Sequence, residues 1–229
     1  MVGAAIARAL ASEGAIPVIG DGDFDVSPPY AQGVNAGRFG SPEHAKAVVQ
    51  KTIEKFGTLD ALVNQVAIAP GGGLERQNTE HYVETLKCIL LPCYTVTHHA
   101  LPHLKRAGGS IVNVIVEAAG TVPAEYGGAS AEGAVLALTR EWAAELAGSG
   151  IRVNAVLPST GTPWLPGQGP KKSSDQQERQ KPVPTETGPE SAGTSANEIA
   201  AMVVFLLSSR ATHITGQHWY VNGGPTASR

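Results

Sequence analysis

The chain has 229 residues, of which 42% are hydrophobic and 16% charged, and its formal net charge at pH 7 is −3. This size and composition predict one globular domain with a sizeable core, and the small negative charge argues against a nucleic acid or an anionic membrane as a partner. The sequence contains no apolar run long enough to cross a membrane. Cys88 and Cys93 lie five residues apart on a predicted helix, a spacing that does not favour a disulfide. Together these features predict a reduced, cytoplasmic protein.

The first part of the chain predicts one helix and one strand. Apolar residues at helical spacing indicate a helix over residues 3–14, and residues 15–20 have the pattern of a short strand. Asp21 follows this strand directly. Pro28 and Pro29 come soon after it, and because proline cannot continue a helix, no second helix is expected there.

The next stretch predicts a strand between two helices. An N-cap serine followed by proline indicates a helix over residues 41–56, and residues 59–64 have the pattern of a strand. Residues 79–106 predict a long helix with a kink at Pro92. No acidic residue joins the histidines of this helix at helical spacing, so a polar surface is favoured over a metal site. These histidines are His98, His99 and His103.

The stretch between residues 109 and 158 predicts a strand, a helix and a second strand. Residues 110–116 form a β-branched apolar run, which suits a strand that is buried on both faces. Residues 129–147 carry apolar residues at helical spacing, and residues 151–157 form another apolar run. Strand, helix and strand with short connections form a βαβ unit, and such units build parallel sheets.

The last third predicts a loop, a helix and a strand. Residues 165–194 are rich in Pro, Gly, Ser and Gln and predict a mobile loop. Residues 195–208 predict a helix with Ser195 or Asn197 as N-cap, and residues 218–221 predict the last strand.

Four phrases of the sequence, in the same order along the chain, resemble the short-chain dehydrogenase/reductase superfamily. They are GAAIARALASEG at 3–14 for the first helix of that family, FGTLDALVN at 56–64 for its fourth strand, GIRVNAVLP at 150–158 for its sixth and ITGQHWYVNGG at 214–224 for its last. The resemblance implies one Rossmann-like α/β domain over residues 1–229. Its sheet would be parallel and doubly wound, and truncated in the N-terminal, nucleotide-binding half.

In the nucleotide-binding half, the resemblance implies only three remnants of a dinucleotide site. Gly3 corresponds to the last glycine of the family's glycine-rich turn, so the family's first strand and earlier glycines have no counterpart in this sequence. Either the start of the sequence is truncated or, as we favour, the protein has lost this strand and turn. Asp21 stands where an acid can bind the adenosine ribose, although a solvated loop acid is the preferred interpretation. Asn64 is the one asparagine left of the family's Asn-Asn-Ala-Gly phrase. We therefore expect this chain to bind no dinucleotide.

The family's chemistry depends on a tyrosine that acts as acid or base and on a lysine four residues later, whose charge lowers the pKa of that tyrosine. In this chain Gly128 occupies the tyrosine position and Glu132 the lysine position. Tyr126 lies two residues earlier, but Ser130 rather than lysine stands four residues after it. A glutamate in the lysine position would raise the pKa of a neighbouring tyrosine, which opposes hydride chemistry.

Two further catalytic positions of the family also differ. The family's serine corresponds to Val116 or Glu117, depending on the alignment, and its helix asparagine corresponds to Ile89. The candidates for acid or base chemistry that remain are Glu117, Tyr126 and Glu132, and no metal site is expected.

These differences favour a catalytically silent subunit that assembles with an active, NAD-dependent dehydrogenase paralogue, on which the NAD would be bound. Heteromers of this kind occur in the family: the dehydrogenase that acts on hydroxybenzylsuccinyl-CoA has one degenerate subunit. Two alternatives stay open. One is a non-redox cyclase or lyase that reuses Glu117, Tyr126 and Glu132, and the other is an atypical NAD(P)-dependent oxidoreductase.

Assembly is expected through the two helices at residues 79–106 and 129–147, which commonly form a subunit interface in the family. We expect this pair to expose an apolar face that includes Leu138 and Trp142 and that a single chain would leave in water. The expected product is a tetramer built as a dimer of dimers, either of identical chains or, preferably, with the active paralogue.

Overall fold

The computed structural model describes residues 2–20, 31–33, 42–67, 78–116, 129–158 and 194–221, and the statements below refer to these residues. Their helices and strands follow one another in the order α1 (Val2–Ser12), β1 (Val18–Ile19), β2 (Gln32–Gly33), α2 (Pro42–Phe56), β3 (Ala61–Ala67), α4 (Thr79–Ala107), β4 (Ser110–Val116), α5 (Ala129–Leu146), β5 (Arg152–Pro158), α7 (Ala196–Leu207) and β6 (His218–Val221). Of the loop predicted at 165–194, only Thr194 is described.

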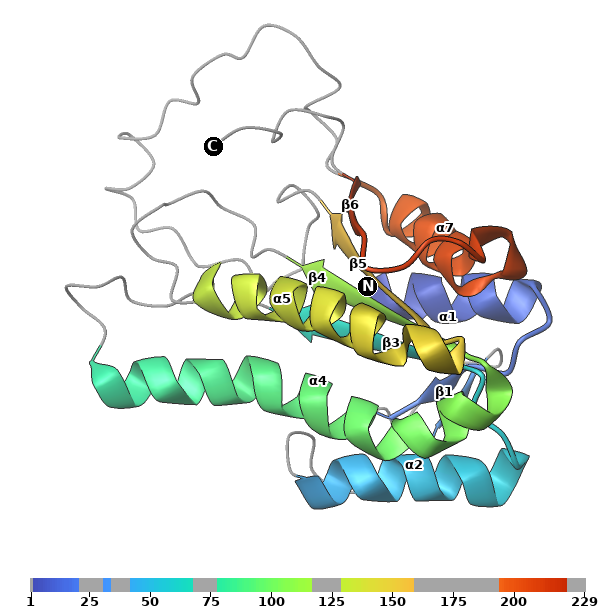
Figure 1. Cartoon of the computed structure of the whole chain (residues 1–229), viewed down its shortest axis with the longest axis horizontal. Coiled ribbons are helices and arrows are strands. Elements are labelled where there is room, and N and C mark those ends of the chain that lie inside the picture. Colours follow the sequence, from blue (N-terminus) through green and yellow to red (C-terminus); the bar gives the residue numbers. More distant parts are fainter. Residues whose placement is uncertain are drawn as a thin grey trace, which may run out of the picture.

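The main sheet is parallel and has the strand order β3-β4-β5-β6 (Figure 1). Helices α4 and α5 cover one face of it and helices α1 and α7 the other, while α2 packs on the outside of α4. Strands β1 and β2 form a separate parallel pair. This arrangement confirms the predicted Rossmann-like α/β fold with a parallel sheet.

The core lies on both sides of the central strands. All seven residues of β4 are buried, as predicted for a strand with helices on both faces. Alternate side chains of the sheet enter two apolar clusters, one beneath α4 and α5 and the other beneath α1 and α7. The burial of these side chains supplies most of the free energy that holds the layers together.

Several predicted boundaries differ from those of the structure. Strand β3 continues to Ala67, three residues beyond its predicted end at Asn64, and β1 has two residues where six were expected. Helix α4 continues through Pro92 and also contains Pro102. Proline removes one helical hydrogen bond, but α4 packs against α2, α5 and β3, and this packing outweighs the local cost.

Helix α7 is fixed at both ends. At its start, the Ser195 hydroxyl accepts a hydrogen bond from the Glu198 N–H, and the Glu198 carboxylate accepts one from the Ser195 N–H, so Ser195 rather than Asn197 is the N-cap. At its end, the guanidinium of Arg152 donates to the carbonyl oxygens of Leu206 and Leu207 at 2.5 and 3.2 Å. Arg152 begins β5, so this contact joins the helix to the sheet.

Gly109 lies where the end of α4 turns into β4, at a point of close approach. A Cβ atom at this position would lie 2.5 Å from the carbonyl oxygen of Asp60 and 2.9 Å from Cδ2 of Leu104. Only glycine therefore fits between the start of β3 and the last turns of α4. None of the described helices combines the length and the apolar character that a membrane crossing requires.

Candidate functional site

The candidate site is the region where the carboxyl ends of β3, β4 and β5 meet the first turns of α1 and α5. Ligands of open parallel α/β sheets bind at this end, because the loops that follow the strands and the first turns of the helices lie together there. The described residues at this end include Gln65, Val116, Ser130 and Glu132, together with Gly3 in α1. Asp21, Glu117, Tyr126 and Gly128 lie outside the described residues.

Asn64 lies on β3 and faces α4 rather than the open end of the sheet. Its side-chain amide donates to Oγ1 of Thr97 at 3.0 Å and to Oδ1 of Asn113 at 2.9 Å. The amide of Asn113 in turn donates to Oγ1 of Thr139 at 2.9 Å. These buried groups connect β3, β4, α4 and α5, so Asn64 holds the layers in register inside the core.

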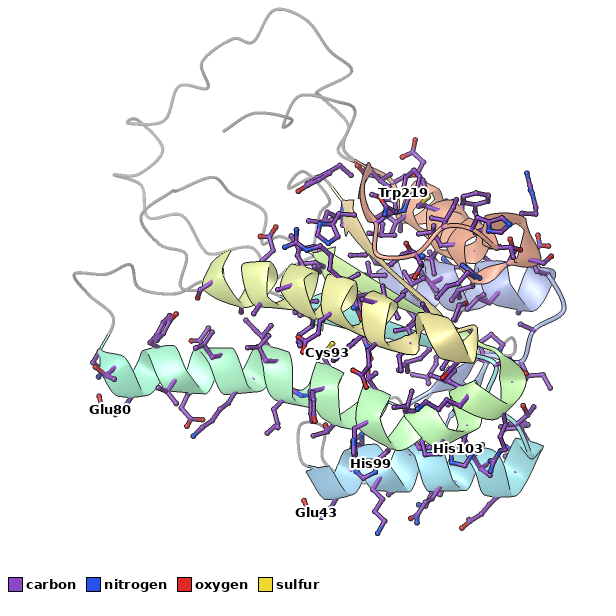
Figure 2. All side chains as sticks on the ribbon, viewed as in Figure 1. Glu43, Glu80, Cys93, His99, His103 and Trp219 are labelled. Atoms are coloured by element: carbon purple, nitrogen blue, oxygen red, sulfur yellow. The ribbon has the colours of Figure 1, made fainter. Side chains whose placement is uncertain are left out.

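Cys93 belongs to the same buried region (Figure 2), with its sulfur 3.9 Å from Oδ1 of Asn113. Burial raises the pKa of the Cys93 thiol to about 12. The thiol is therefore neutral at physiological pH and is not a nucleophile.

Gly3 lies in the first turn of α1 and faces the end of β3. A Cβ atom at this position would lie 2.8 Å from Oε1 of Gln65, so the glycine allows the helix to approach this side chain closely. Gln65 points to the α1 side of the sheet, since side chains alternate along a strand and Asn64 faces α4. Gly3 thus lets the first turn of α1 come close to the exposed end of the Gln65 side chain.

A hydrogen bond that sequence reasoning missed connects α4 to the first turn of α5. The Tyr82 hydroxyl donates to Oγ of Ser130 at 3.0 Å, and the Tyr82 side chain is 38% exposed. The two residues are 48 positions apart, so no local sequence pattern predicts their contact. The pair places two hydroxyl groups at the first turn of α5, which also carries Glu132.

The histidines of α4 do not gather around a common point. His98 and His99 meet edge to face, with ring centroids 5.3 Å apart, and Nδ1 of His103 accepts a hydrogen bond from the Arg106 guanidinium at 2.6 Å. Figure 2 shows His99 and His103 on the side of α4 that faces α2. Partial burial, with smaller effects from His98 and Lys46, lowers the pKa of His99. Within the described segments, no three His, Cys, Asp or Glu side chains are placed to hold a metal ion together.

Comparison with known proteins identifies the family. The sequence profile described as Enoyl-(Acyl carrier protein) reductase matches residues 2–226. The chain belongs to the short-chain dehydrogenase/reductase superfamily. Its relatives include the 3-oxoacyl-(acyl-carrier-protein) reductase of Thermotoga maritima, which is 32% identical over 185 residues, or 80% of this chain and 72% of the relative.

Two further relatives match nearly the whole chain. The trans-4-hydroxycyclohexanecarboxylate dehydrogenase of Sinomonas cyclohexanicum is 32% identical over 246 residues, which cover 99% of this chain and 89% of the relative. The crystal structure of Cj0485 dehydrogenase superposes with a TM-score of 0.79 at 27% identity, over 100% of this chain and 91% of that chain. These names are those of redox enzymes, and the chain is accordingly a member of an oxidoreductase family.

Two family positions that are polar in the resemblance are apolar and buried in this short-chain dehydrogenase/reductase. Ile89, at the helix asparagine position, is 4% exposed and packs in the cluster beneath α4 and α5. Val116, one of the two residues aligned with the serine, ends β4 and is 5% exposed. Neither side chain can donate or accept a hydrogen bond, so neither can orient a substrate carbonyl.

The family implies a nicotinamide dinucleotide, and one of the proposed remnants, Asn64, does not fit a role in binding it. Asn64 has its amide hydrogen-bonded inside the core. Asn64 has a structural function in the fold instead, whereas Gly3 lies beside the exposed side chain of Gln65. Glu132 is partly buried in the first turn of α5, where the family's lysine would stand.

Proposed function

We propose that this chain is a catalytically silent short-chain dehydrogenase/reductase subunit that assembles with an active, NAD-dependent paralogue. The observation that carries the proposal is Glu132 in the first turn of α5, at the family's lysine position. A lysine there favours the phenolate form of the tyrosine, whereas a carboxylate disfavours it. This helix would then lack the charge that hydride transfer requires.

The apolar positions at Ile89 and Val116 support the same proposal. Both side chains are buried in β-sheet or helix packing and offer no hydrogen bond to a substrate. Because these positions serve the core, the fold would be kept while the chemistry is lost. We further propose that this chain binds no dinucleotide and that the NAD is held by the partner.

Assembly is proposed through an exposed apolar surface on the first half of α4. In Figure 1 the first turns of α4 extend beyond the start of α5. The surface consists of Val83, Leu91 and Tyr94, which are 38–51% exposed. The expectation that Trp142 is exposed was wrong, because Trp142 is only 7% exposed and lies beside the Tyr94 ring, with centroids 6.4 Å apart. Leu138 packs against the core cluster.

The test compares variants of the candidate acid and base residues in the complex isolated with its native partner. For a silent subunit, Glu117→Gln, Tyr126→Phe and Glu132→Gln should leave the rate of the complex nearly unchanged. A loss of roughly 10²- to 10⁴-fold in a variant that is still assembled would show acid/base catalysis by this chain and overturn the proposal. Purification of the native chain without a paralogue would overturn it as well.

A second candidate, a non-redox cyclase or lyase, is favoured by the Tyr82–Ser130 hydrogen bond. This bond directs the Tyr82 hydroxyl proton at Oγ of Ser130, at the first turn of α5, an arrangement suited to proton transfer. Tyr82→Phe should lower such an activity while Tyr94→Phe, an exposed tyrosine on the same helix, should not. Equal rates for the two variants would exclude a role of the Tyr82 hydroxyl.

A further inference from the structure

Helix α2 is attached to the rest of the described structure mainly through α4. Among the described elements, α4 is the one against which α2 packs extensively, and α2 lies on its outer side (Figure 1). The apolar part of this contact is small. Val49 is buried in the cluster beneath α4 and α5, and Ile53, one helical turn later, packs against the same cluster while partly exposed. A helix that buries so little apolar surface can separate locally while the sheet stays folded.

The end of strand β1 is attached to α2 rather than to the main sheet. Nε2 of the buried His44 donates a hydrogen bond to the carbonyl oxygen of Gly20 at 2.8 Å, directly after β1. A Cβ atom at Gly20 would lie 2.9 Å from Cγ1 of Val48, so the backbone also approaches α2 closely there. Strands β1 and β2 form a pair of their own. A displacement of α2 relative to α4 would therefore carry the end of β1 with it.

Imidazole groups and positive charges meet at the contact between α2 and α4. Figure 2 shows His99 and His103 on the side of α4 that faces α2. The partly buried His99 ring lies 5.3 Å from the ring of His98, and Lys46 on α2 is close enough for its charge to act on His99. His103 is hydrogen-bonded to the guanidinium of Arg106. A protonated His99 would therefore stand among cationic groups from both helices.

The described residues around this contact supply no compensating negative charge. Within the described segments, no carboxylate lies within ion-pair distance of His99 or Lys46. The acidic residues of α2, Glu43 and Glu54, are exposed, and β1, β2 and β3 carry no charged residue. In Figure 1, helix α5 lies on the opposite side of α4 from α2. Its charged residues are Glu132, Arg140, Glu141 and Glu145.

We propose that the contact between α2 and α4 is a proton-sensitive switch, in which proton uptake by His99 releases α2 and the end of β1 from α4 while the main sheet stays folded. The released form has a neutral counterpart in the closed form, because only the neutral ring fits beside Lys46 and His98 without charge repulsion. The switch does not depend on whether the chain is catalytically silent or on what it assembles with.

The direction of the pH effect follows from the environment of His99. Partial burial, and after it the charges of His98 and Lys46, lower the pKa of His99 below its ordinary value of 6.5. The closed form therefore takes up the proton less readily than the released form, in which the ring is in water. The contact has its full stability above pH 6.5 and loses it as the pH falls from 6.5 through the pKa of the closed form.

Hydrogen exchange of the full chain at about pH 7.5 and about pH 5.5, corrected for the intrinsic exchange rates, tests the proposal. The protection of the α2 amides should be at least about twofold lower at the acidic pH, while that of the β4 amides stays the same. His99→Gln keeps a polar side chain that takes up no proton, and it should abolish the difference. His213→Gln, at an exposed histidine after α7, is the matched control and should retain it.

An NMR titration of the histidine rings identifies the group that takes up the proton. The His99 signal, recognised by its loss in His99→Gln, should titrate below pH 6.5. Lys46→Gln removes one neighbouring charge, so it should raise the pKa of His99 and reduce the acid loss of α2 protection. Lys51→Gln removes an exposed charge from the same helix and should do neither.

The other outcomes would overturn the proposal. Equal protection of α2 at the two pH values would show that the contact does not respond to protons, and an unchanged response in His99→Gln would assign it to another group. A parallel loss of protection in β4 would indicate general acid unfolding. A His99 pKa above 6.5 would show that an acidic group compensates the charge. If His99→Gln does not fold, the comparison of Lys46→Gln with Lys51→Gln decides the question.

Discussion

The side-chain amide of Asn64 donates a 2.9 Å hydrogen bond to Oδ1 of Asn113, across two neighbouring strands and inside the core. Both residues occupy equivalent places in the ladder, since Asn64 is paired with Asn113 in the register of β3 and β4. The pair therefore fixes the register of the sheet and, through Thr97 and Thr139, the position of the two helices on that face.

The first prediction concerns this pair. Asn113→Ala should lower the free energy of unfolding by about 2–4 kcal/mol, because it creates a small cavity and removes partners of two buried polar groups. Urea denaturation monitored by circular dichroism measures the change. Glu145→Ala, on the exposed side of α5, serves as control and should change stability by no more than about 0.5 kcal/mol. Equal stability of the two variants would contradict a structural role for the amide.

The second prediction concerns the pH dependence of the α7 N-cap. The Ser195 backbone N–H, and after it the Ser195 hydroxyl, hold the pKa of Glu198 below its ordinary value of 4.5. Because the pKa is lower in the folded state, the contribution of Glu198 is complete above pH 4.5 and is lost as the pH falls through its folded pKa. Glu198→Gln should therefore be less stable than the unmodified chain at pH 7, with the difference shrinking in acid. A difference that stays constant down to about pH 3 would show that the charge is not involved.

The third prediction concerns the exposed surface of α4. Tyr94→Glu places a charge among side chains that an interface would bury, and it should weaken assembly by about 30-fold or more. Light scattering across a concentration series measures the shift. Glu54→Lys, an exposed charge change on α2, should leave assembly unchanged. If the unmodified chain is monomeric at micromolar concentration, both this surface and the partner-subunit proposal fail.

The fourth prediction concerns the cofactor. The isolated chain should bind neither NAD(H) nor NADP(H) at concentrations up to about 1 mM, which corresponds to a binding free energy weaker than about −4 kcal/mol. Calorimetric titration checks this directly, and the purified 3-oxoacyl-(acyl-carrier-protein) reductase relative provides a reference for the method. Micromolar affinity would contradict this prediction and would indicate an oxidoreductase that binds its own cofactor.

The elements that could be predicted are those whose signal is local. The β-branched run of β4 predicted its bounds correctly, because burial on both faces needs an unbroken apolar sequence. The last strand, at His218–Val221, was predicted with the same bounds, and Ser195 was predicted as one of two N-caps. In each case the residues that decide the structure lie within a few positions of one another.

Features that depend on distant neighbours could not be predicted. The end of β3 is set by its pairing with β4, which carries it to Ala67, and the two-residue length of β1 is set by the short pairing available with β2. Trp142 is buried through packing with residues distant in the sequence, in the cluster beneath α4 and α5. The role of Asn64 was missed for the same reason, since its partners lie 33 and 49 residues away.

The tight fit around Gly109 has a consequence for experiments that scan many substitutions at once. Any side chain there would push the start of β3 away from the end of α4, so every variant at this position should fail to fold. Such a position has the mutational profile of a catalytic residue although it touches no ligand. A mutational scan that records only whether a variant is functional would therefore count such a structural position as a catalytic one. Positions should be assigned to a reaction only where the variant protein accumulates normally and still fails.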